Sequence, residues 1–477
     1  MVKDGFIEIS TELQQIITAE QAWHYNIIPK QSENNRIEFY IDELKYTDQI
    51  SDELELLFGK TILLERVDSN TLVKSLGKYY RKKKTTEGKA TDVFIPKSDD
   101  FLINLISEAD DIGSSDIHIE TYEDRCRVRM RIDGKLIERY VLNKEDYPAI
   151  INKIKIKANL DIAEKRLPQD GRIFFHDGNQ KFDIRVSVLP TLYGEKVVMR
   201  LLSKDATDID IELLGMNPEQ LKSYTEGIKK PHGILLISGP TGSGKTTTLY
   251  ATLKILNKEN TNILTIEDPI EYTLEGINQV QLKESIGLTF ASALRTFLRQ
   301  DPDVIMLGEI RDGETAKMAV RAALTGHLVL STIHTNSAWG TISRLIDMGV
   351  PPFLVASTLN LSVAQRLVRL LCPVCKEKQE FNSALYPRNY KAPIQIKEHV
   401  VAKGCDACYY TGYKGRKAVY EIIPIDHELT ENIKVQNIDE NKISDIAGFK
   451  TLSDSAFELF KEGMTTIEEI YSILINS

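Results

Sequence analysis

The chain has 477 residues, with 60 lysines and arginines against 69 acidic residues and a net charge of −9. Because a single hydrophobic core seldom grows past about 250–300 residues, we expect several domains, and the acidic balance argues against general nucleic-acid binding. No stretch approaches the roughly 18 apolar residues that span a bilayer. Asp4 and Glu8 stand where a signal peptide has basic and then apolar residues, so we expect a cytoplasmic protein.

Residues 1–77 alternate short helical and strand patterns, which predicts a small N-terminal adaptor domain. We expect four aromatic residues in its core: Trp23, Tyr25, Phe39 and Tyr40. A basic linker over 78–97 follows, with five basic residues within 78–84 and then Thr, Gly and Ala. Such a run is typical of a solvated hinge, and attraction to anionic lipid head groups is the alternative.

A second small α/β domain is predicted over 98–203. A helix over 100–110 is followed by several short strand patterns. These are IHIE (117–120), RCRVRMRID (125–133), GRIFFHD (171–177) and FDIRVSVL (182–189). The segment 203–215 then joins this domain to a core over 213–370.

The segment GPTGSGKT (239–246) fits the nucleotide-phosphate loop G-x-x-x-x-G-K-[ST] at every fixed position. An apolar strand (233–238) enters the loop and a helix (246–256) leaves it, which argues against a glycine turn that fits by chance. Backbone N–H groups at the helix N-terminus would hold phosphate, Lys245 would reach the β- and γ-phosphates, and Thr246 would ligate Mg²⁺. The predicted nucleotide-binding residues are Gly239, Pro240, Thr241, Gly242, Ser243, Gly244, Lys245, Thr246 and Thr247.

Two further strand patterns end in acidic residues. ILTIEDPIEY (263–272) ends in Glu267, Asp268 and Glu271, and VIMLGEIRD (304–312) carries a lone Glu309 after a glycine. Carboxylates at the carboxyl edge of a parallel sheet lie where ligands of such sheets bind. We expect Glu309 to polarise the attacking water, with Glu267 as the alternative base.

The segment TGHLVLSTIHT (325–335) is a further strand with a histidine near each end. His327 and His334 are both open to two interpretations. Each could be a hydrogen-bonded residue at the sheet edge or a direct participant in catalysis.

Four cysteines form two C-x-x-C pairs, Cys372 with Cys375 and Cys405 with Cys408, with 29 residues between the inner two. This spacing predicts a closed, structural Cys₄ zinc site in a module over 371–415, with disulfides or a redox pair as the alternative. Cys126 is interpreted as a strand residue without chemistry. A helical C-terminal part over 416–477 follows, with one helix face marked by Leu452, Ala456, Leu459 and Phe460.

Several long segments together resemble one family, the bacterial type II secretion and type IV pilus assembly ATPases (GspE/PulE type, close to PilB). They include the phosphate loop, the acidic and histidine segments just described, LRTFLRQDPDVIMLGEIRD (294–312) and AQRLVRLLCPVC (364–375). In the second domain they include SSDIHIE (114–120), RLPQDGRI (166–173) and RVSVLPTLYGEKVVMRLL (185–202). Most of residues 98–475 is covered.

The resemblance implies an α/β fold with a RecA-like P-loop ATPase core, preceded by a PAS-like domain and the adaptor domain. It also implies that Arg185 and Arg200 reach the nucleotide phosphates, with salt bridges as the alternative and Arg166 and Arg172 as weaker candidates. Arg295, Arg299 and Arg311 are interpreted as ion-pair partners of the acidic segments.

The same resemblance implies a homo-hexameric ring with ATP, Mg²⁺ and Zn²⁺ as its ligands. The implied partners are inner-membrane platform and cytoplasmic-domain proteins of a secretion or pilus machine, and the implied membrane contact is peripheral. The Cys₄ module is typical of the family's secretion and extension ATPases. Residues 1–90 lack the cyclic-di-GMP-binding pattern of many pilus extension ATPases, which favours secretion.

Two functions outside this family role are weighed against it. One is a DNA-translocating ATPase. The core is not basic and the chain has no run of basic residues interleaved with aromatics apart from the 78–84 linker, which argues against direct nucleic-acid binding. The second is a protein that binds ATP only as a structural ligand, and Glu309 with its neighbouring histidine segment argues against that function.

Overall fold

The computed structural model describes residues 2–3, 6–7, 9–14, 16–33, 36–80, 101–177, 180–202, 210–435 and 449–475. The chain divides into two compact units. One contains Met1–Phe94, Leu371–Lys378 and Val401–Lys414, and the other contains Ile95–Leu370, Gln379–Val400 and Gly415–Ser477. Most of the predicted basic linker (81–97) and residues 203–209 of the predicted connection to the core lie outside the described residues.

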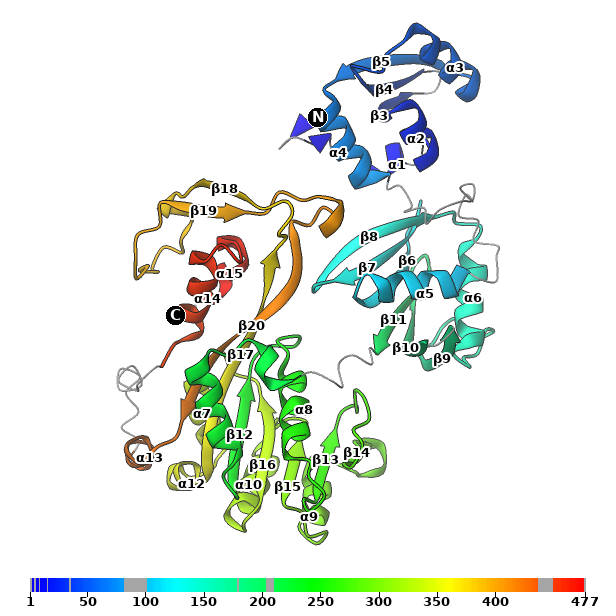
Figure 1. Ribbon diagram of the computed structural model, residues 1–477. Helices are drawn as coiled ribbons and strands as arrows, with labels where there is room; N and C mark the ends of the chain where they lie inside the picture. Colours follow the sequence, from blue (N-terminus) through cyan, green and yellow to red (C-terminus); the bar gives the residue numbers. More distant parts are fainter. Residues whose placement is uncertain are drawn as a thin grey trace. The chain divides into compact units, whose positions relative to one another are not determined.

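The N-terminal domain is a three-stranded sheet with short helices (Figure 1). Strand β4 lies in the middle, antiparallel to β3 and parallel to β5. Phe39 and Tyr40 are buried as predicted, and Trp23 and Tyr25 pack partly buried against the same core. The elements are β1 (Val2–Lys3), β2 (Phe6–Ile7), α1 (Thr11–Gln14), α2 (Ala19–Tyr25), β3 (Ile27–Glu33), β4 (Arg36–Asp42), α3 (Asp48–Phe58), β5 (Thr61–Val67) and α4 (Ser69–Tyr79).

The second domain is a six-stranded antiparallel sheet in the order β8-β7-β6-β11-β10-β9. Two helices lie across it and bury one apolar face each (Figure 1). Strand β7 alternates buried and half-buried residues along its whole length, so its arginines share the face away from the core. The elements are α5 (Phe101–Asp111), β6 (Ser114–Thr121), β7 (Cys126–Ile132), β8 (Lys135–Leu142), α6 (Tyr147–Lys157), β9 (Gln169–Asp177), β10 (Gln180–Thr191) and β11 (Gly194–Leu202).

The core contains a seven-stranded sheet in the order β14-β13-β15-β16-β12-β17-β20. The elements before β17 are η2 (Ile211–Leu214), α7 (Pro218–Ile228), β12 (Gly233–Ser238), α8 (Lys245–Leu256), β13 (Ile263–Glu267), β14 (Asn278–Gln281), η3 (Glu284–Ile286), α9 (Phe290–Phe297), β15 (Val304–Leu307), α10 (Gly313–Leu324), β16 (Leu328–Ile333), α11 (Ala338–Asp347) and α12 (Pro352–Thr358). The strand β12 and the helix α8 are the two elements predicted around the phosphate loop.

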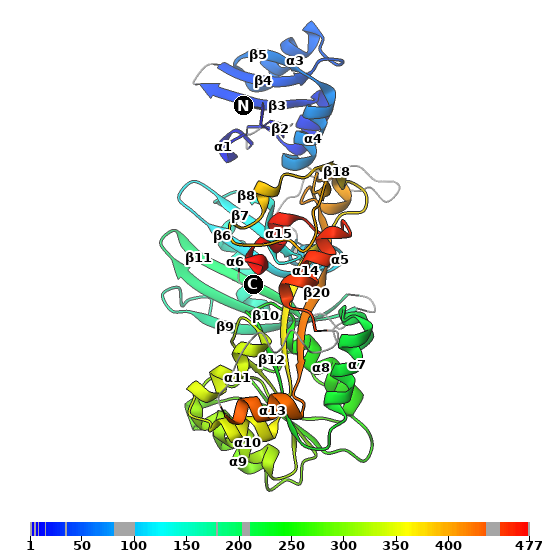
Figure 2. The same ribbon diagram turned by 90° about the vertical axis from the view of Figure 1, so that its left-hand side faces the viewer.

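Helices cover both faces of this sheet, as Figure 2 shows. Leu235 and Ile237 of β12 pack with α7 and α8, whereas Ile234 and Leu236 pack with the cluster formed by α9, α10, α11 and α12. Strands β13, β15, β16, β12 and β17 are parallel neighbours. Their carboxyl ends therefore meet at one edge, where ligands of open α/β sheets bind.

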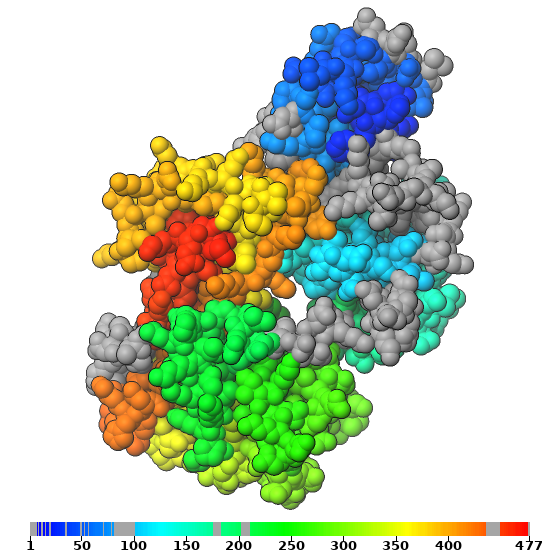
Figure 3. All heavy atoms as spheres, viewed as in Figure 1, coloured from blue at the N-terminus to red at the C-terminus, as the bar shows by residue number. Residues whose placement is uncertain are grey.

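The C-terminal part extends the core. It comprises β17 (Leu359–Leu371), β18 (Glu377–Glu380), η4 (Ser383–Leu385), β19 (Glu398–Val401), η5 (Asp406–Cys408), β20 (Tyr413–Pro424), α13 (His427–Lys434), α14 (Leu452–Lys461) and α15 (Ile467–Leu474). The predicted face of α14 is buried. Figure 3 shows the C-terminal helices, in red, against the segment between the cysteine pairs, where Phe381 and Phe460 place their ring centroids 5.5 Å apart.

Candidate functional site

Three glycines shape the loop between β12 and α8. Gly239, Gly242 and Gly244 have φ angles of 150°, 80° and 88°, which residues with side chains rarely adopt. A Cβ on Gly239 would lie 2.5 Å from the carbonyl oxygen of Gln365, and one on Gly244 would lie 2.8 Å from Gln365 Nε2. The loop therefore folds tightly against β17 and presents backbone N–H groups at the N-terminus of α8.

The remaining loop residues suit a phosphate ligand. The Ser243 hydroxyl is buried and has no hydrogen-bond partner among the described residues. Pro240, Thr241 and Thr246 are exposed, and Thr247 is half-buried. An orphaned buried hydroxyl beside an exposed N–H cradle fits a polar, anionic group, and the exposed Thr246 hydroxyl is accessible to a metal that such a group carries.

Lys245 lies across the loop. Its ammonium donates hydrogen bonds to the carbonyl oxygens of Gly239 at 2.8 Å and Pro240 at 2.9 Å. Burial lowers its pKa, the nearby Glu309 carboxylate opposes this shift, and the Arg366 guanidinium adds to it. A phosphate that takes the place of these two carbonyls would satisfy the ammonium with a full negative charge.

Glu309 follows β15 by two residues and lies between the side chains of Arg311 and His334. Its Oε1 accepts a hydrogen bond from Arg311 Nη2 at 2.6 Å, and its Oε2 lies 3.3 Å from His334 Nε2. Burial disfavours ionisation of this carboxyl, of which 15 % is exposed, but Arg311 and His334 outweigh it and hold the pKa of Glu309 below its ordinary value. Glu309 is therefore a carboxylate at neutral pH, as a general base requires.

The two histidines of the 325–335 segment lie at opposite ends of β16. His334 follows the strand at its carboxyl end, beside Glu309. His327 precedes the strand, and its Nδ1 lies 2.9 Å from the carbonyl oxygen of Ala322 at the end of α10. The structure thus brings His334, and not His327, to the carboxyl edge of the sheet.

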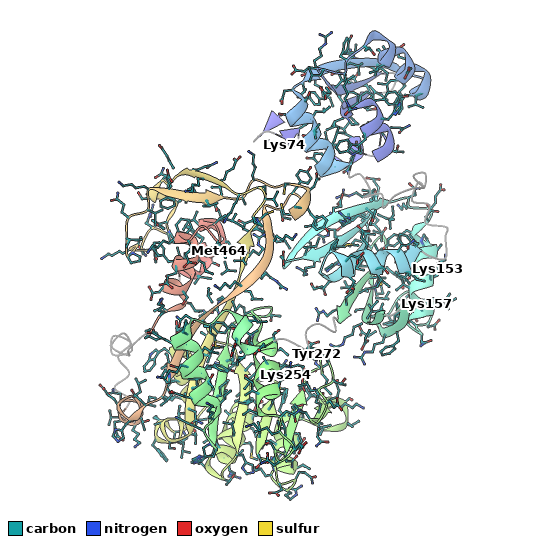
Figure 4. The ribbon with its side chains drawn as sticks, viewed as in Figure 1. Lys74, Lys153, Lys157, Lys254, Tyr272 and Met464 are labelled. Carbon is teal, nitrogen blue, oxygen red and sulfur yellow. The ribbon has the colours of Figure 1, made fainter. Side chains whose placement is uncertain are left out.

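Glu267 is buried at the end of β13 and accepts three side-chain hydrogen bonds. Its Oε1 accepts from the Thr265 hydroxyl at 2.7 Å and from Gln279 Nε2 at 3.0 Å, and its Oε2 accepts from the Tyr250 hydroxyl. The Tyr250 ring packs edge-on against Tyr272, which Figure 4 labels, with centroids 4.4 Å apart. These contacts suit a carboxylate that supports the acidic segment.

Three of the four candidate arginines of the second domain lie in one cross-strand row. Arg185 on β10 is the register partner of Arg172 on β9 and of Arg200 on β11. Arg185 donates from Nη1 to Glu271 Oε2 at 3.0 Å and from Nη2 to the carbonyl of Ile270. Arg200 forms a salt bridge with Asp116. Both arginines are therefore in ion pairs, as the alternative to phosphate binding predicts. An ion pair of this kind does not prevent the guanidinium from exchanging its carboxylate partner for a phosphate when nucleotide binds.

The remaining arginines have local partners. Arg166 is exposed and contacts Glu164, and Arg172 lies 3.7 Å from Asp183. In the core, Arg311 pairs with Glu309 and Asp268, as predicted for an acidic-segment partner. Arg295 pairs with Glu314, and Arg299 donates to the carbonyl oxygen of Arg295.

Sequence reasoning missed the residues that support the phosphate loop from β17. Gln365 is buried, and its Oε1 accepts from the Thr248 hydroxyl of α8 at 2.9 Å. Arg366 donates from Nη2 to the carbonyl oxygen of Asn336 at 2.9 Å and lies close to Gly239. The only signal was their place in the AQRLVRLLCPVC segment, because neither residue belongs to a motif with its own chemistry.

Glu421 on β20 is a second residue that the sequence did not indicate. Its carboxylate accepts from the backbone N–H of Ala338 at 2.7 Å and of Leu452 at 3.2 Å, the first residues of α11 and α14. Burial raises its pKa, and these N–H donors oppose that shift. One side chain thus connects the helix that follows His334 with the C-terminal helices.

The four cysteines form one cluster, with all Sγ atoms within 4.8 Å of one another. The Sγ separations are 3.9 Å for Cys372 and Cys405, 3.7 Å for Cys375 and Cys408, and 3.8 Å for Cys405 and Cys408. Ligands at about 2.3 Å in a tetrahedron are separated by about 3.8 Å, so these thiols fit a zinc ion. Cys126 is a buried strand residue whose Sγ lies 3.2 Å from the Thr121 hydroxyl.

The fold and the site define the class of protein as a P-loop ATPase with a RecA-like core. The chain belongs to the family described as "Type II/IV secretion system protein", which matches residues 96–472. No helix in the described part of the chain is long and apolar enough to cross a membrane.

Several characterised relatives share almost half of their aligned residues with this chain. "Type II secretion system protein E" of Pseudomonas aeruginosa is 48 % identical over 78 % of this chain and 74 % of that protein. "Type II secretion system ATPase E" of Vibrio cholerae is 46 % identical over the same shares. "Type IV pilus assembly ATPase PilB" of Myxococcus xanthus is 49 % identical over 77 % of this chain and 66 % of that protein.

Solved structures agree on the fold. The Legionella pneumophila ATPase DotB has a TM-score of 0.62 at 20 % identity, covering 82 % of this chain and 98 % of DotB. The pilus retraction motor PilT, solved with bound ADP, has a TM-score of 0.53 at 25 % identity, covering 78 % of this chain and 96 % of PilT.

Proposed function

We propose that this chain hydrolyses ATP to power pseudopilus assembly and protein export by a type II secretion system. The observation that carries the proposal is the Glu309 carboxylate, held between Arg311 and His334 at the sheet edge to which the phosphate loop belongs. The relatives named for type II secretion support this machine, and the PilB relative keeps pilus extension as the second candidate.

In the proposed reaction Glu309 accepts a proton from the attacking water, and His334 and Arg311 orient and charge-stabilise its carboxylate. Lys245 and the loop N–H groups bind the phosphates, and Glu267 supports the acidic segment through its hydrogen bonds. Arg185 and Arg200 contribute guanidinium charge to the γ-phosphoryl group. Thr246 would hold Mg²⁺, which neutralises phosphate charge when bound.

We further propose the assembly and the domain limits that the family resemblance implies. The functional form is a cytoplasmic homo-hexamer that binds inner-membrane platform and cytoplasmic-domain proteins of its machine and contacts the membrane peripherally. The proposed regions are an adaptor (1–77), a linker (78–97), a second domain (98–203), the ATPase core (213–370), a zinc module (371–415) and a helical part (416–477).

The general base is tested by Glu309→Gln, which keeps the size of the side chain but cannot accept the proton. Turnover should fall by about 10²-fold or more, the range of a lost general base, while ATP binding stays intact. Lys245→Ala should instead weaken nucleotide binding. Near wild-type hydrolysis by Glu309→Gln in a steady-state phosphate-release assay would contradict the assignment.

The choice of machine is tested in the source cell. Deleting the gene should stop the export of folded proteins while any surface pili remain, and plasmid-borne Lys245→Ala should not restore export. Loss of pili with normal export would assign the chain to pilus extension instead.

The zinc site is proposed to be structural, since four thiolates leave no open position. The purified protein should contain close to one zinc per chain, and Cys405→Ser should release it and destabilise the cysteine cluster while the phosphate loop still binds nucleotide. Cys126→Ser is the matched control and should retain the metal. A folded, zinc-free protein with four titratable thiols would contradict the proposal.

A further inference from the structure

The row of arginines on the second domain continues across five strands. Arg172, Arg185 and Arg200 are register partners on β9, β10 and β11, and Arg200 is in turn the register partner of Asp116 on β6. Asp116 is itself paired with Arg131 on β7. Directly opposed residues on antiparallel strands share one face of the sheet, so one carboxylate stands among four guanidinium groups.

Asp116 is held from three directions. Its Oδ2 accepts from the Ser115 hydroxyl at 2.8 Å and lies 3.4 Å from Arg131 Nε, and its Oδ1 accepts from Arg200 Nε at 3.0 Å. Only 9 % of the Asp116 side chain is exposed. A carboxylate with this many donors, on a strand in the middle of a sheet, has little freedom to turn.

Arg200 uses only its inner nitrogen for this contact. Its side chain is 56 % exposed, and its terminal nitrogens make no hydrogen bond to any residue that the structure describes. Arg185 differs, because both of its terminal nitrogens are bonded to the 270–271 backbone and side chain. Arg200 therefore has its Nε fixed on Asp116, while its two terminal nitrogens remain available to bind a ligand.

We propose that Asp116 is a positioning residue that fixes the guanidinium of Arg200 for the phosphoryl group of ATP. The inference rests on the proposed role of Arg200 in hydrolysis. Without Asp116, Arg200 would lie between Arg185 and Arg131 with no anion in the row. Repulsion from these two guanidinium groups and free rotation of the side chain would then prevent Arg200 from holding its terminal nitrogens in one position. A planar guanidinium anchored at Nε loses less rotamer freedom when it binds a phosphate than a free one does.

A double-mutant cycle on the full-length protein tests the proposal, with steady-state ATP hydrolysis and nucleotide affinity measured for each variant. Asp116→Asn should lower kcat by about ten- to a hundredfold, the scale of a misplaced reacting group, with little change in KM for ATP. In an Arg200→Ala background, Asp116→Asn should cause less than about a twofold further loss, because contacting residues that act as one unit are not additive.

Glu138→Gln is the matched control, since Glu138 pairs with Arg125 and Arg127 on the same sheet and lies outside the row. It should leave kcat unchanged. If Asp116→Asn shifts the unfolding midpoint, Arg200→Lys tests the same anchor without replacing Asp116, because lysine keeps the positive charge but has no Nε to bind the carboxylate. It should be nearly as slow as Arg200→Ala.

Three results would overturn the inference. Wild-type turnover by Asp116→Asn or Arg200→Lys, alongside a slow Arg200→Ala, would show that Arg200 acts without this anchor. Multiplicative losses in the double variant would show that Asp116 acts by another route. Full activity of Arg200→Ala itself would remove the inference together with the proposed role of Arg200, and so would be recognised as a failure of the proposed function.

Discussion

The ATPase core and the second domain hold their proposed site residues in different ways. In the core, Lys245, Glu309 and His334 each begin a helix or follow a strand end by one or two residues, so the backbone of the parallel sheet places them. In the second domain, Arg185 and Arg200 lie within long strands, and carboxylates place their guanidinium groups.

The two regions should therefore differ in how strongly mutations of neighbouring residues affect their site residues. A residue placed by the backbone keeps its position unless it is itself replaced or the sheet unfolds. A long, flexible side chain placed by an ion pair can also lose its function when its partner is replaced. Sensitivity to neighbours should therefore concentrate in the second domain.

The largest effect should come from removing the two arginines together. The Arg185→Ala, Arg200→Ala double variant should bind ATP but hydrolyse it about 10³-fold or more slowly, since a positioned arginine can be worth about 10³–10⁵ in rate. Specific activity of the wild-type protein should also rise with protein concentration, because the proposed functional form is a homo-hexamer. The measurement is hydrolysis across a dilution series, with molecular mass determined in parallel.

Full activity of a strictly monomeric species, unchanged by loss of both arginines, would contradict the proposed role of the second domain in hydrolysis. The second domain would then be an adaptor only. The Arg172→Ala variant, with its weak 3.7 Å pairing to Asp183, is a useful control in the same row. It should lose much less activity than the double variant.

The next effect concerns a nearly buried ion pair between the core and the C-terminal helices. Arg369 on β17 contacts Glu469 on α15, with 7 % and 17 % of their side chains exposed. Glu469→Gln should lower the free energy of unfolding by about 3 kcal/mol, because it removes the negative charge that contacts this nearly buried guanidinium. Urea unfolding measures this change.

The matched control is Glu314→Gln, which removes the partner of Arg295 from a pair with 52 % and 65 % of its side chains exposed. It should cost about 0–1 kcal/mol. Equal effects of the two variants would mean that burial does not decide the strength of ion pairs in this core.

The smallest effect should appear in the pH dependence of hydrolysis. Arg311 and His334 hold the pKa of Glu309 below its ordinary value against the effect of burial, so activity that needs the carboxylate is lost only as the pH falls through that lowered pKa. Arg311→Gln should raise this pKa and shift the acidic limb of kcat/KM to higher pH. Arg295→Gln is the control and should leave the pH profile unchanged. If the acidic limb of kcat/KM does not move in Arg311→Gln, the group whose protonation stops hydrolysis is not Glu309.

Features that depend on the spacing of residues over a few positions could be predicted from the amino-acid sequence alone. The phosphate loop needs its glycines and Lys245 next to one another, and each C-x-x-C pair places two thiolates on one side of a turn, so both were predictable. The family was predictable as well, since the matching segments are long and cover most of the chain.

Tertiary structure alone decided which distant residues meet. Gln365 reaches Thr248 across 117 positions and Asp116 reaches Arg200 across 84. Strand order and register set these contacts, and neither can be read from the residue types, because an Asp or Gln in a strand pattern has no local partner to indicate its role. The position of His334 beside Glu309 was decided in the same way, since the direction of β16 within the parallel sheet brings His334 and not His327 to that edge.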